Sequence, residues 1–164
     1  MKKITYLIFT IVFLILVSGC SGYKPIFASK NLQFNISEYS IEGNKILGKK
    51  IYSKLNRLSK SNKDDQNIRA INLLINSSKY KNSTAKDSAG NVVAYKITLK
   101  TKIEVTDFMT DDKILDQTFT SSVSYNVQSR QSDTLKLENR SIDNLIDKTY
   151  ADLLIKLSQN IVKK

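Results

Sequence analysis

The residue of this chain with the clearest chemistry is Cys20, which is the only cysteine among 164 residues. Two lysines near the start are followed by an apolar run from Ile4 to Val17 and then by a serine, a glycine and the cysteine. A positive segment, an apolar segment and small residues before a cleavage point are the parts of a secretory signal peptide. We therefore predict that residues 1–19 are a lipoprotein signal peptide. Cys20, exposed as the new N-terminus, would carry fatty chains on its thiol and its amine.

Two plainer interpretations of this segment are weaker. The apolar run from Ile4 to Val17 is shorter than the roughly 20 residues that a membrane-spanning helix needs. If the segment were an ordinary secretory signal, the only cysteine of the chain would lie directly after the cleavage point by chance. The residue after Cys20 is Ser21 rather than aspartate, which favours the outer membrane under the sorting rule of enteric bacteria. We expect a protein anchored on the periplasmic side of the outer membrane through a lipidated tether over residues 20–30.

The residue types that are missing exclude several classes of chemistry. The chain has no histidine, and no thiol is left free once Cys20 is lipidated. This leaves no Ser-His or Cys-His nucleophile, no usual zinc site and no disulfide. An envelope hydrolase could use the acid pairs Asp64-Asp65 and Asp111-Asp112, but both lie in expected turns, where acidic residues hydrogen-bond the backbone. We predict that the protein is not an enzyme and has no metal site and no cofactor besides its covalent lipid.

The mature chain is strongly basic. Its formal net charge is +11, and removal of the two lysines of the signal peptide leaves +9. In a cytosolic protein this charge would suggest nucleic acid. An exported, anchored chain meets lipid phosphates and acidic protein surfaces instead, so we predict a membrane contact through the anchor and no nucleic-acid partner. Part of the excess of basic over acidic residues has another explanation, because many lysines, asparagines and isoleucines are typical of an AT-rich genome.

Two hydrophobic periods alternate along residues 31–164 and predict one domain. Apolar residues at every second position indicate strands, and apolar residues at three- and four-residue spacings indicate helices. Asn44 is a suitable N-cap for the first helix. The expected elements are a strand over Leu32–Ile41, a helix over Asn44–Leu58, a strand over Ala70–Lys81, a turn over Asn82–Asn91, strands over Val93–Val105 and Leu115–Val127, a loop over Gln128–Asp133, and a helix that begins at Asp133 or Ser141 and ends near Val162.

This β-α-β-β-β-α order predicts an α+β fold class. Two amphipathic helices can bury their apolar stripes together by packing on one face of a roughly four-stranded, mostly antiparallel sheet. The strand over Val93–Val105 has the clearest alternation and places Lys96, Thr98, Lys100 and Lys102 on its other face. We expect that face to meet water or a polar partner.

Three stretches of the chain resemble the LptE family of lipopolysaccharide-assembly lipoproteins. They are the mature start Cys20–Pro25, the glycine turn and strand in Gly90–Ile97, and the closing helix around Tyr150–Leu154. The resemblance spans nearly all of the mature chain and implies a non-catalytic subunit of the lipopolysaccharide translocon. Such a subunit lies largely inside an LptD-type outer-membrane β-barrel, assists its assembly and contacts lipopolysaccharide on its way to the outer leaflet. The lysine and threonine face would suit a polar barrel interior, and it is equally explained as a solvated sheet face.

Cations near loop tips are the candidate lipopolysaccharide contacts, because this ligand is anionic at its phosphates. In the family, basic residues at the glycine hairpin are implicated in binding. Here Ser88 and Ala89 precede Gly90, and the nearest cation is Lys86. The other candidates lie near the start of the last helix and are Arg130, Lys136 and Arg140. Each of them, taken alone, is also explained as a solvated charge.

An accessory lipoprotein of another envelope lipid-trafficking complex is the alternative function. It would have the same kind of anchor and a similar small domain but a different partner. The identity of the protein that co-purifies with the chain would distinguish the two.

Overall fold

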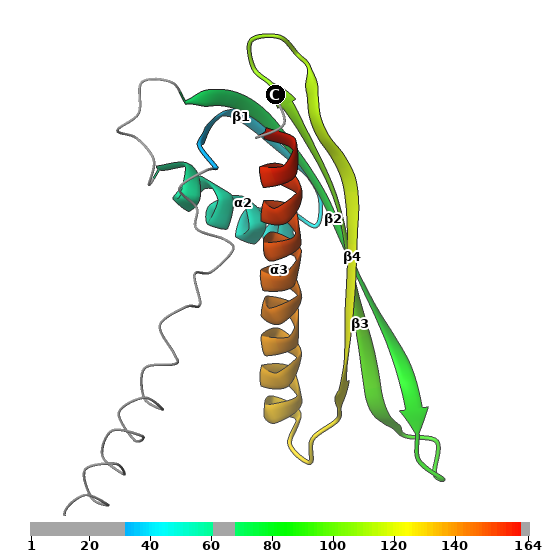
Figure 1. Ribbon diagram of the computed structural model, residues 1–164. Coiled ribbons are helices and arrows are strands. Elements are labelled where there is room, and N and C mark those ends of the chain that lie inside the picture. Colours follow the sequence, from blue (N-terminus) through cyan, green and yellow to red (C-terminus); the bar gives the residue numbers. More distant parts are fainter. Residues whose placement is uncertain (1–31, 61–67, 162–164) are drawn as a thin grey trace, which may run out of the picture.

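The computed structural model describes residues 32–60 and 68–161, which form one sheet covered by two helices (Figure 1). The signal peptide, Cys20, the tether over residues 20–30 and the acid pair Asp64-Asp65 lie outside the described residues. No helix in the described ranges is long and apolar enough to cross a membrane. The elements follow the predicted order and are β1 (Phe34–Gly43), α2 (Lys45–Lys60), β2 (Arg69–Lys86), β3 (Val92–Asp107), β4 (Lys113–Asn126) and α3 (Gln131–Ile161).

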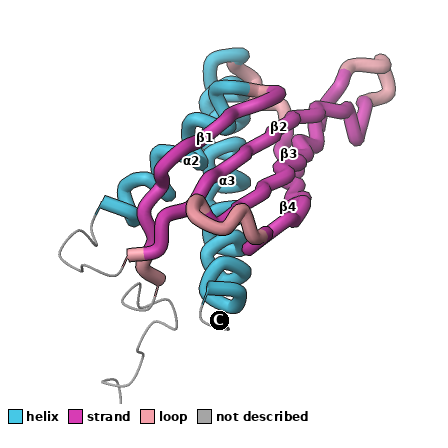
Figure 2. Tube along the Cα trace, turned by 90° about the horizontal axis from the view of Figure 1, so that it is seen from above, coloured by secondary structure: helices cyan, strands magenta, loops and turns pink. Residues whose placement is uncertain are grey.

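The sheet is open and mixed, with the strand order β1-β2-β3-β4. β1 and β2 are parallel, and α2 forms the crossover that a parallel pair requires. The β2–β3 and β3–β4 pairs are antiparallel. Figure 2 shows both helices on one face of the sheet. The fold class predicted from the sequence is therefore confirmed.

The hydrophobic core lies between the helices and the odd-numbered positions of β2, β3 and β4. Ile75 pairs with Ile103, and Leu73 pairs with Val105, so that their side chains line the covered face. Burying a side chain of this size contributes roughly 1.5–3 kcal/mol. Other fully buried members of the core are Phe34, Ile51, Leu55, Ile71, Ile97, Leu99, Ile146, Leu153 and Leu157.

A tight turn joins β1 to α2 and confirms Asn44 as the N-cap. The amide of Leu47 donates a hydrogen bond to Oδ1 of Asn44 at 3.2 Å. The amide of Asn44 donates in turn to the carbonyl oxygen of Ser77 at 2.7 Å, which fastens the turn to β2. Gly43, the residue before the cap, has a φ of 65°. Glycine adopts this left-handed conformation without a steric penalty, so it lets the chain reverse here.

β2 is longer than predicted, because residues 82–86 continue the strand and do not form a turn. Ser83 pairs with Tyr95 of β3. Polar residues are tolerated in this ladder because β2 is exposed from residue 79 to its end. The turn itself is shorter and is stabilised by Asp87, whose Oδ1 accepts a hydrogen bond from the amide of Asn91 at 2.8 Å.

α3 begins at Gln131, which is earlier than either predicted start. The carbonyl oxygen of Arg130 accepts hydrogen bonds from the amides of Asp133 (3.1 Å) and Thr134 (3.2 Å). The hydroxyl of Thr134 accepts a hydrogen bond from the amide of Gln128 at 2.8 Å. These contacts satisfy backbone groups of the last loop residues and the first turn, so the predicted polar loop ends at Arg130.

The turn before α2 predicts a large effect of Gly43→Ala. A Cβ at this position would overlap the carbonyl oxygen of Ser77, a backbone atom that cannot move without disturbing β2. The steric overlap adds to the cost of a positive φ for alanine. We expect the free energy of unfolding to fall by about 3 kcal/mol, measured by urea denaturation.

Gly90→Ala is the matched control for this prediction. Gly90 also has a positive φ, of 86°, but its added Cβ would have no atom within 4 Å. Only the cost of a positive φ for alanine remains, so we expect the free energy of unfolding to fall by about 1 kcal/mol. Equal losses for the two variants would contradict the steric explanation.

Candidate functional site

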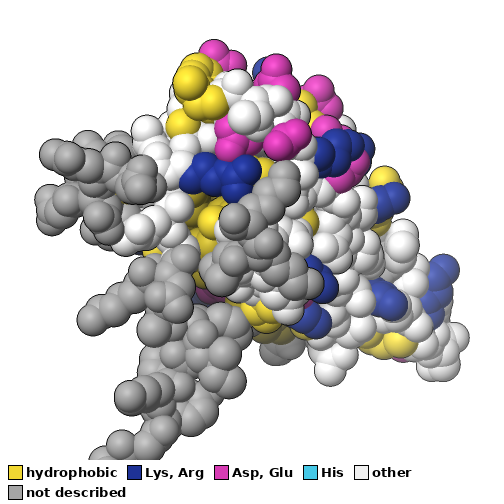
Figure 3. Space-filling model, turned by 45° about the horizontal axis from the view of Figure 1, so that its top comes forward, with side chains coloured by type: hydrophobic (Ala, Val, Ile, Leu, Met, Phe, Trp, Pro, Cys, Tyr) yellow, Lys and Arg dark blue, Asp and Glu magenta, His cyan; other side chains and the backbone are white. Residues whose placement is uncertain are grey.

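Cations are concentrated at the end of the sheet that carries the β2–β3 hairpin. The amide of Val127, just after β4, donates to the carbonyl oxygen of Val93 at 2.9 Å, which brings the β4–α3 loop beside the hairpin. Figure 3 shows separate Lys and Arg side chains on this part of the molecule, toward the lower right of the view. We call this region the basic end and define it by Lys79, Lys81, Lys86, Lys96, Arg130, Lys136 and Arg140.

One of the four predicted contact residues lies at the end of β2, and the other three lie at or near the start of α3, all within the basic end. Lys86 is the exposed last residue of β2. Arg130 is exposed and immediately precedes α3, where its carbonyl oxygen caps the first turn. Lys136 and Arg140 line a shallow pocket of about 290 Å³ beside the start of α3. Gln128, Asp133 and Leu137 complete the lining of that pocket.

A charged and aromatic cluster that the sequence analysis missed holds these places together. The carboxylate of Glu138 on α3 accepts hydrogen bonds from Nζ of Lys81 at 2.6 Å and from the hydroxyl of Tyr125 at 2.9 Å. Nζ of Lys79 lies 3.6 Å from the same carboxylate. Nζ of Lys81 also lies 4.3 Å from the centre of the Tyr95 ring, a favourable position for a cation over an aromatic face. The cluster therefore joins the first half of α3 to all three long strands.

The pKa values of the cluster keep it ionised. Partial burial by itself raises the pKa of Glu138, but the hydrogen bonds from Lys81 and Tyr125 and the charges of the two lysines outweigh it and hold the pKa below its usual value. The hydrogen bond to Glu138 raises the pKa of Lys81. Burial raises the pKa of Tyr125. At neutral pH the cluster is thus a carboxylate surrounded by cations and a neutral phenol.

One signal in the sequence could have indicated this cluster. Ile71, Leu73 and Ile75 define the face of β2 that points to the helices, and the same alternation places Lys79 and Lys81 on that face. Lysines that extend toward a neighbouring helix are well placed to pair with an acidic residue on it. The sequence does not say which carboxylate on the last helix supplies it.

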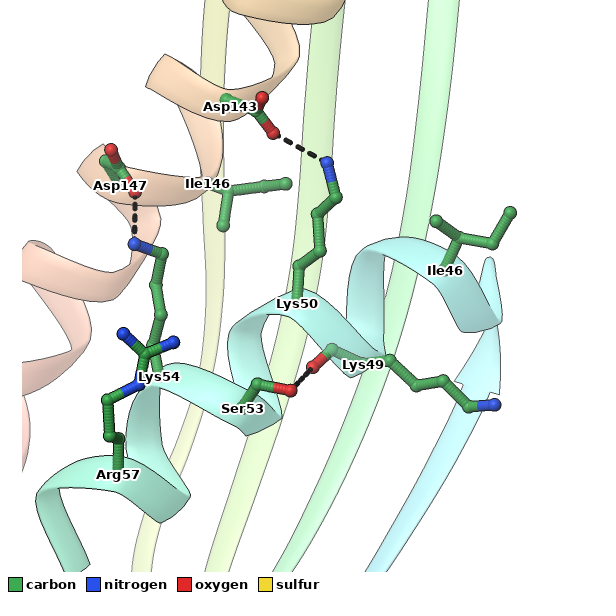
Figure 4. Close-up of a pocket in the computed structure, with 9 residues that line it drawn as sticks. All are labelled: Ile46, Lys49, Lys50, Ser53, Lys54, Arg57, Asp143, Ile146 and Asp147. Atoms are coloured by element: carbon green, nitrogen blue, oxygen red, sulfur yellow. Dashed lines mark hydrogen bonds and ion pairs between the residues drawn. The ribbon is translucent and has the colours of Figure 1, made fainter.

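A second basic surface lies in the groove between α2 and α3. The groove has a volume of about 500 Å³. Nζ of Lys50 lies 2.7 Å from Asp143 and Nζ of Lys54 lies 2.7 Å from Asp147, so two ion pairs cross the groove on either side of Ile146 (Figure 4). Both pairs are well exposed, and exposed pairs contribute little to stability. The two pairs therefore add little to the packing of α2 against α3.

The sheet face opposite the helices is polar and carries no helix in the described part of the chain (Figure 2). The predicted residues Lys96, Thr98, Lys100 and Lys102 lie on it. Lys102 is already paired, because its Nζ donates to Glu104 and lies 3.6 Å from Asp116. The rest of the face is rich in hydroxyl and amide groups, from Asn72, Asn76, Ser78, Thr118, Thr120, Ser122 and Ser124.

The acidic side chains of the described chain do not gather into a metal site. No group of three or more within residues 32–60 and 68–161 could hold a metal ion. Asp111 has a φ of 56°, and the carbonyl oxygen of Asp112 accepts a hydrogen bond from the amide of Asp107 at 2.9 Å, so this acid pair forms the β3–β4 turn.

The geometry of the cluster predicts the effect of Glu138→Gln. The change removes a charge that receives several hydrogen bonds, and we expect the free energy of unfolding at pH 7 to fall by about 2 kcal/mol. Because folding lowers the pKa of Glu138, its stabilising effect is complete above the unfolded value of about 4.3 and is lost as the pH falls through the folded value. Urea denaturation of both proteins between pH 7 and pH 3 should show the difference shrinking at the acid end.

Asp143→Asn is the control for Glu138→Gln. It removes an acidic partner of a lysine with the same change in charge, but the Asp143 side chain is 56% exposed, compared with 12% for Glu138. We expect a loss below about 0.5 kcal/mol. A similar loss for both variants at pH 7 would show that the cluster has no special role.

Comparison with known proteins finds a shared fold. No family model matches the chain, and no curated protein matches it by sequence. A Caulobacter crescentus protein described as a lipoprotein superposes with a TM-score of 0.55 at 12% identity, covering 79% of this chain and 92% of that one. Lipoprotein B from Nitrosomonas europaea superposes with a TM-score of 0.53 at 11% identity, covering 74% of this chain and 80% of that one.

A minor lipoprotein from Acinetobacter baumannii gives a TM-score of 0.52 at 16% identity, covering 75% of this chain and 91% of that one. At these identities the likeness concerns the fold. The two helices on a four-stranded sheet thus form an architecture that several bacterial lipoproteins share with this chain.

Proposed function

We propose that this protein is an outer-membrane lipoprotein subunit of the lipopolysaccharide translocon, similar to the LptE family. In this role it would occupy and help to assemble an LptD-type β-barrel and contact lipopolysaccharide during its insertion. The observation that carries the proposal is the fold shared with solved lipoproteins, in a chain whose only cysteine directly follows a predicted lipoprotein signal. The anchor on Cys20 would hold it at the periplasmic side of the membrane.

The uncovered sheet face supports a position inside a barrel. The interior of a large outer-membrane barrel is polar, so a domain that fills it needs a surface that can form hydrogen bonds. Serine and threonine hydroxyls both donate and accept, and a rigid sheet presents them in fixed rows. Thr120 and Ser122, which face outward on β4, are examples. A hydrophobic face of this size would instead favour aggregation.

The basic end supports a contact with an anionic lipid. Lipopolysaccharide carries phosphates, and charged hydrogen bonds from lysine and arginine to phosphate are among the stronger polar contacts. Lys86 and Arg130 are exposed and lie outside the cluster around Glu138. Lys86 ends β2 at the hairpin and Arg130 lies in the loop before α3, so both are available to an anionic ligand at this end of the molecule.

The alternative function is that of an accessory lipoprotein in another envelope lipid-trafficking complex. The anchor and the fold suit it equally, and the two functions differ in the partner protein. Co-purification therefore tests them directly.

A barrel partner should be recovered with the protein. The tagged full-length protein, extracted from native membranes in mild detergent, should bring down a large β-barrel at a ratio near one to one. Cys20→Ala, which cannot be lipidated, should leave an unprocessed and mislocalised precursor without the barrel. Recovery of the lipoprotein alone, or with an inner-membrane transporter, would favour the alternative function. Correct localisation of Cys20→Ala would contradict the anchor.

Charge reversal in the basic end should weaken binding of the ligand. Lys86→Glu and Arg130→Glu should each weaken lipopolysaccharide binding by about 3- to 10-fold, because each replaces an attractive charge with a repulsive one. Both side chains are exposed, so the free energy of unfolding should change by less than about 0.5 kcal/mol.

Lys148→Glu is the control for both variants. It makes the same change of charge at an exposed site in the second half of α3, outside the basic end. Its binding should stay within about twofold of the unmodified protein, since only net charge has changed. Equal weakening by all three variants would indicate a general charge effect and remove Lys86 and Arg130 from the site.

A further inference from the structure

Two large apolar side chains project from the β3–β4 turn, at the end of the molecule opposite the basic end. Phe108 is 43% exposed and Met109 is 82% exposed, the highest value for a large hydrophobic residue in the described chain. They are neighbours in sequence and belong to a turn at the extremity of the fold (Figure 1). We call this pair the apolar tip. Exposing it to water is unfavourable unless something covers it.

The turn that carries the apolar tip is fixed by hydrogen bonds. Oδ1 of Asp107 accepts hydrogen bonds from the amides of Met109 (2.9 Å) and Thr110 (3.2 Å). The other carboxylate oxygen of Asp107 is paired with Arg69 at the start of β2. These bonds fix the backbone of the turn, on which both side chains of the apolar tip are exposed.

The apolar tip lies beside the point where the described chain begins. The amide of Phe108 donates to the carbonyl oxygen of Ala70 at 3.0 Å, and Phe34 of β1 pairs with Arg69. Neighbouring strands lie about 4.8 Å apart, so the start of β1 is only about 10 Å across the sheet from the tip.

The length of the tether decides which end of the molecule faces the membrane. Cys20 is twelve residues before Leu32, and a chain of that length reaches at most about 40 Å. β2 has 18 residues, which places the hairpin about 60 Å from its first residue. The lipidated residue can therefore reach the level of the apolar tip and cannot reach the hairpin.

We propose that the apolar tip inserts into the surface of the bilayer that holds the lipid anchor, as a second membrane contact that orients the domain. The proposal rests on the lipid anchor of the proposed function. A tethered domain has a high local concentration at the bilayer, so even a weak insertion of two side chains is populated. The hairpin and the basic end then lie at the far end of the domain from this contact.

The charges around the apolar tip specify the kind of lipid. Asp111 and Asp112 follow it in the turn, and the next residue, Lys113, is paired with Asp116 at 2.8 Å, so charges of both signs surround the tip. Figure 3 shows hydrophobic side chains bordered by Asp and Glu side chains at the top of the view. Carboxylates resist both deep burial and a strongly anionic surface. The partner is therefore the interfacial layer of zwitterionic phospholipids such as phosphatidylethanolamine, entered only by Phe108 and Met109.

The chain has no tryptophan, so a single introduced tryptophan reports its own surroundings. Met109→Trp places the reporter in the apolar tip, and Leu135→Trp places a matched reporter on an exposed site of α3 near the basic end. Each full-length lipidated protein is reconstituted in vesicles of phosphatidylethanolamine and phosphatidylcholine, with and without brominated phosphatidylcholine. We expect a blue shift and bromine quenching of the tryptophan fluorescence for Met109→Trp and neither effect for Leu135→Trp.

Unquenched fluorescence from Met109→Trp, or quenching equal to that of Leu135→Trp, would overturn the proposal. A blue shift that appears only when a barrel protein is added, without bromine quenching, would show that the apolar tip contacts that protein and would overturn the membrane contact as well. The mass of the N-terminal peptide reports separately whether Cys20 is lipidated. A lipidated protein with an unquenched tip refutes this inference and leaves the proposed function intact.

Discussion

The carboxylate of Glu138 is the contact on which the arrangement of the basic end depends. The covered face of β2 is apolar as far as Ile75, and beyond the buried Ser77 it continues with Lys79 and Lys81. Hydrophobic packing therefore stops halfway along β2, while Ile97 and Leu99 continue it on β3. At the level of Lys79 and Lys81, the Glu138 carboxylate, which is 12% exposed, takes the place of apolar contacts by joining both lysines and Tyr125 to α3. Without it, the start of α3 would lose its polar contacts with Lys79, Lys81 and Tyr125, which help to fix the cations of its first turns relative to the hairpin.

Much of this fold could be predicted from the sequence because its signals are local. Alternation over Val93–Val105 results directly from one buried and one polar face of β3. Asn44 could be assigned because a cap needs only a short polar side chain before an amphipathic run. The early start of α3 was missed because it is marked by a hydrogen bond from the amide of Gln128 in the loop to the hydroxyl of Thr134 in the helix. Such a contact leaves no periodic pattern in the sequence.

The candidate site was harder to predict than the fold. Lys86, Arg130, Lys136 and Arg140 were chosen as cations near loops, and the structure places all of them at one end. Their grouping could be inferred from topology. Glu138 was missed because its partners lie 57 and 13 residues away in sequence, and only the packing of α3 brings them together. The turn around Asp111-Asp112 was expected, but the ion pair of Asp107 with Arg69 was not, because Arg69 belongs to another strand.

The length of β2 relates the two ends of the molecule to the thickness of a membrane. Its 18 residues span about 60 Å, while a bilayer with its head groups measures about 40–45 Å. Under the proposed function, a domain held at the periplasmic surface by its anchor would carry the β2–β3 hairpin across the depth of the membrane if the strands stood along the membrane normal. Only a polar lumen permits this, since strands with open edges cannot enter lipid. The open edges of the sheet and its hydroxyl-rich face are therefore compatible with a barrel interior and incompatible with the bilayer itself. The membrane contact then has to be confined to the end that carries Phe108 and Met109.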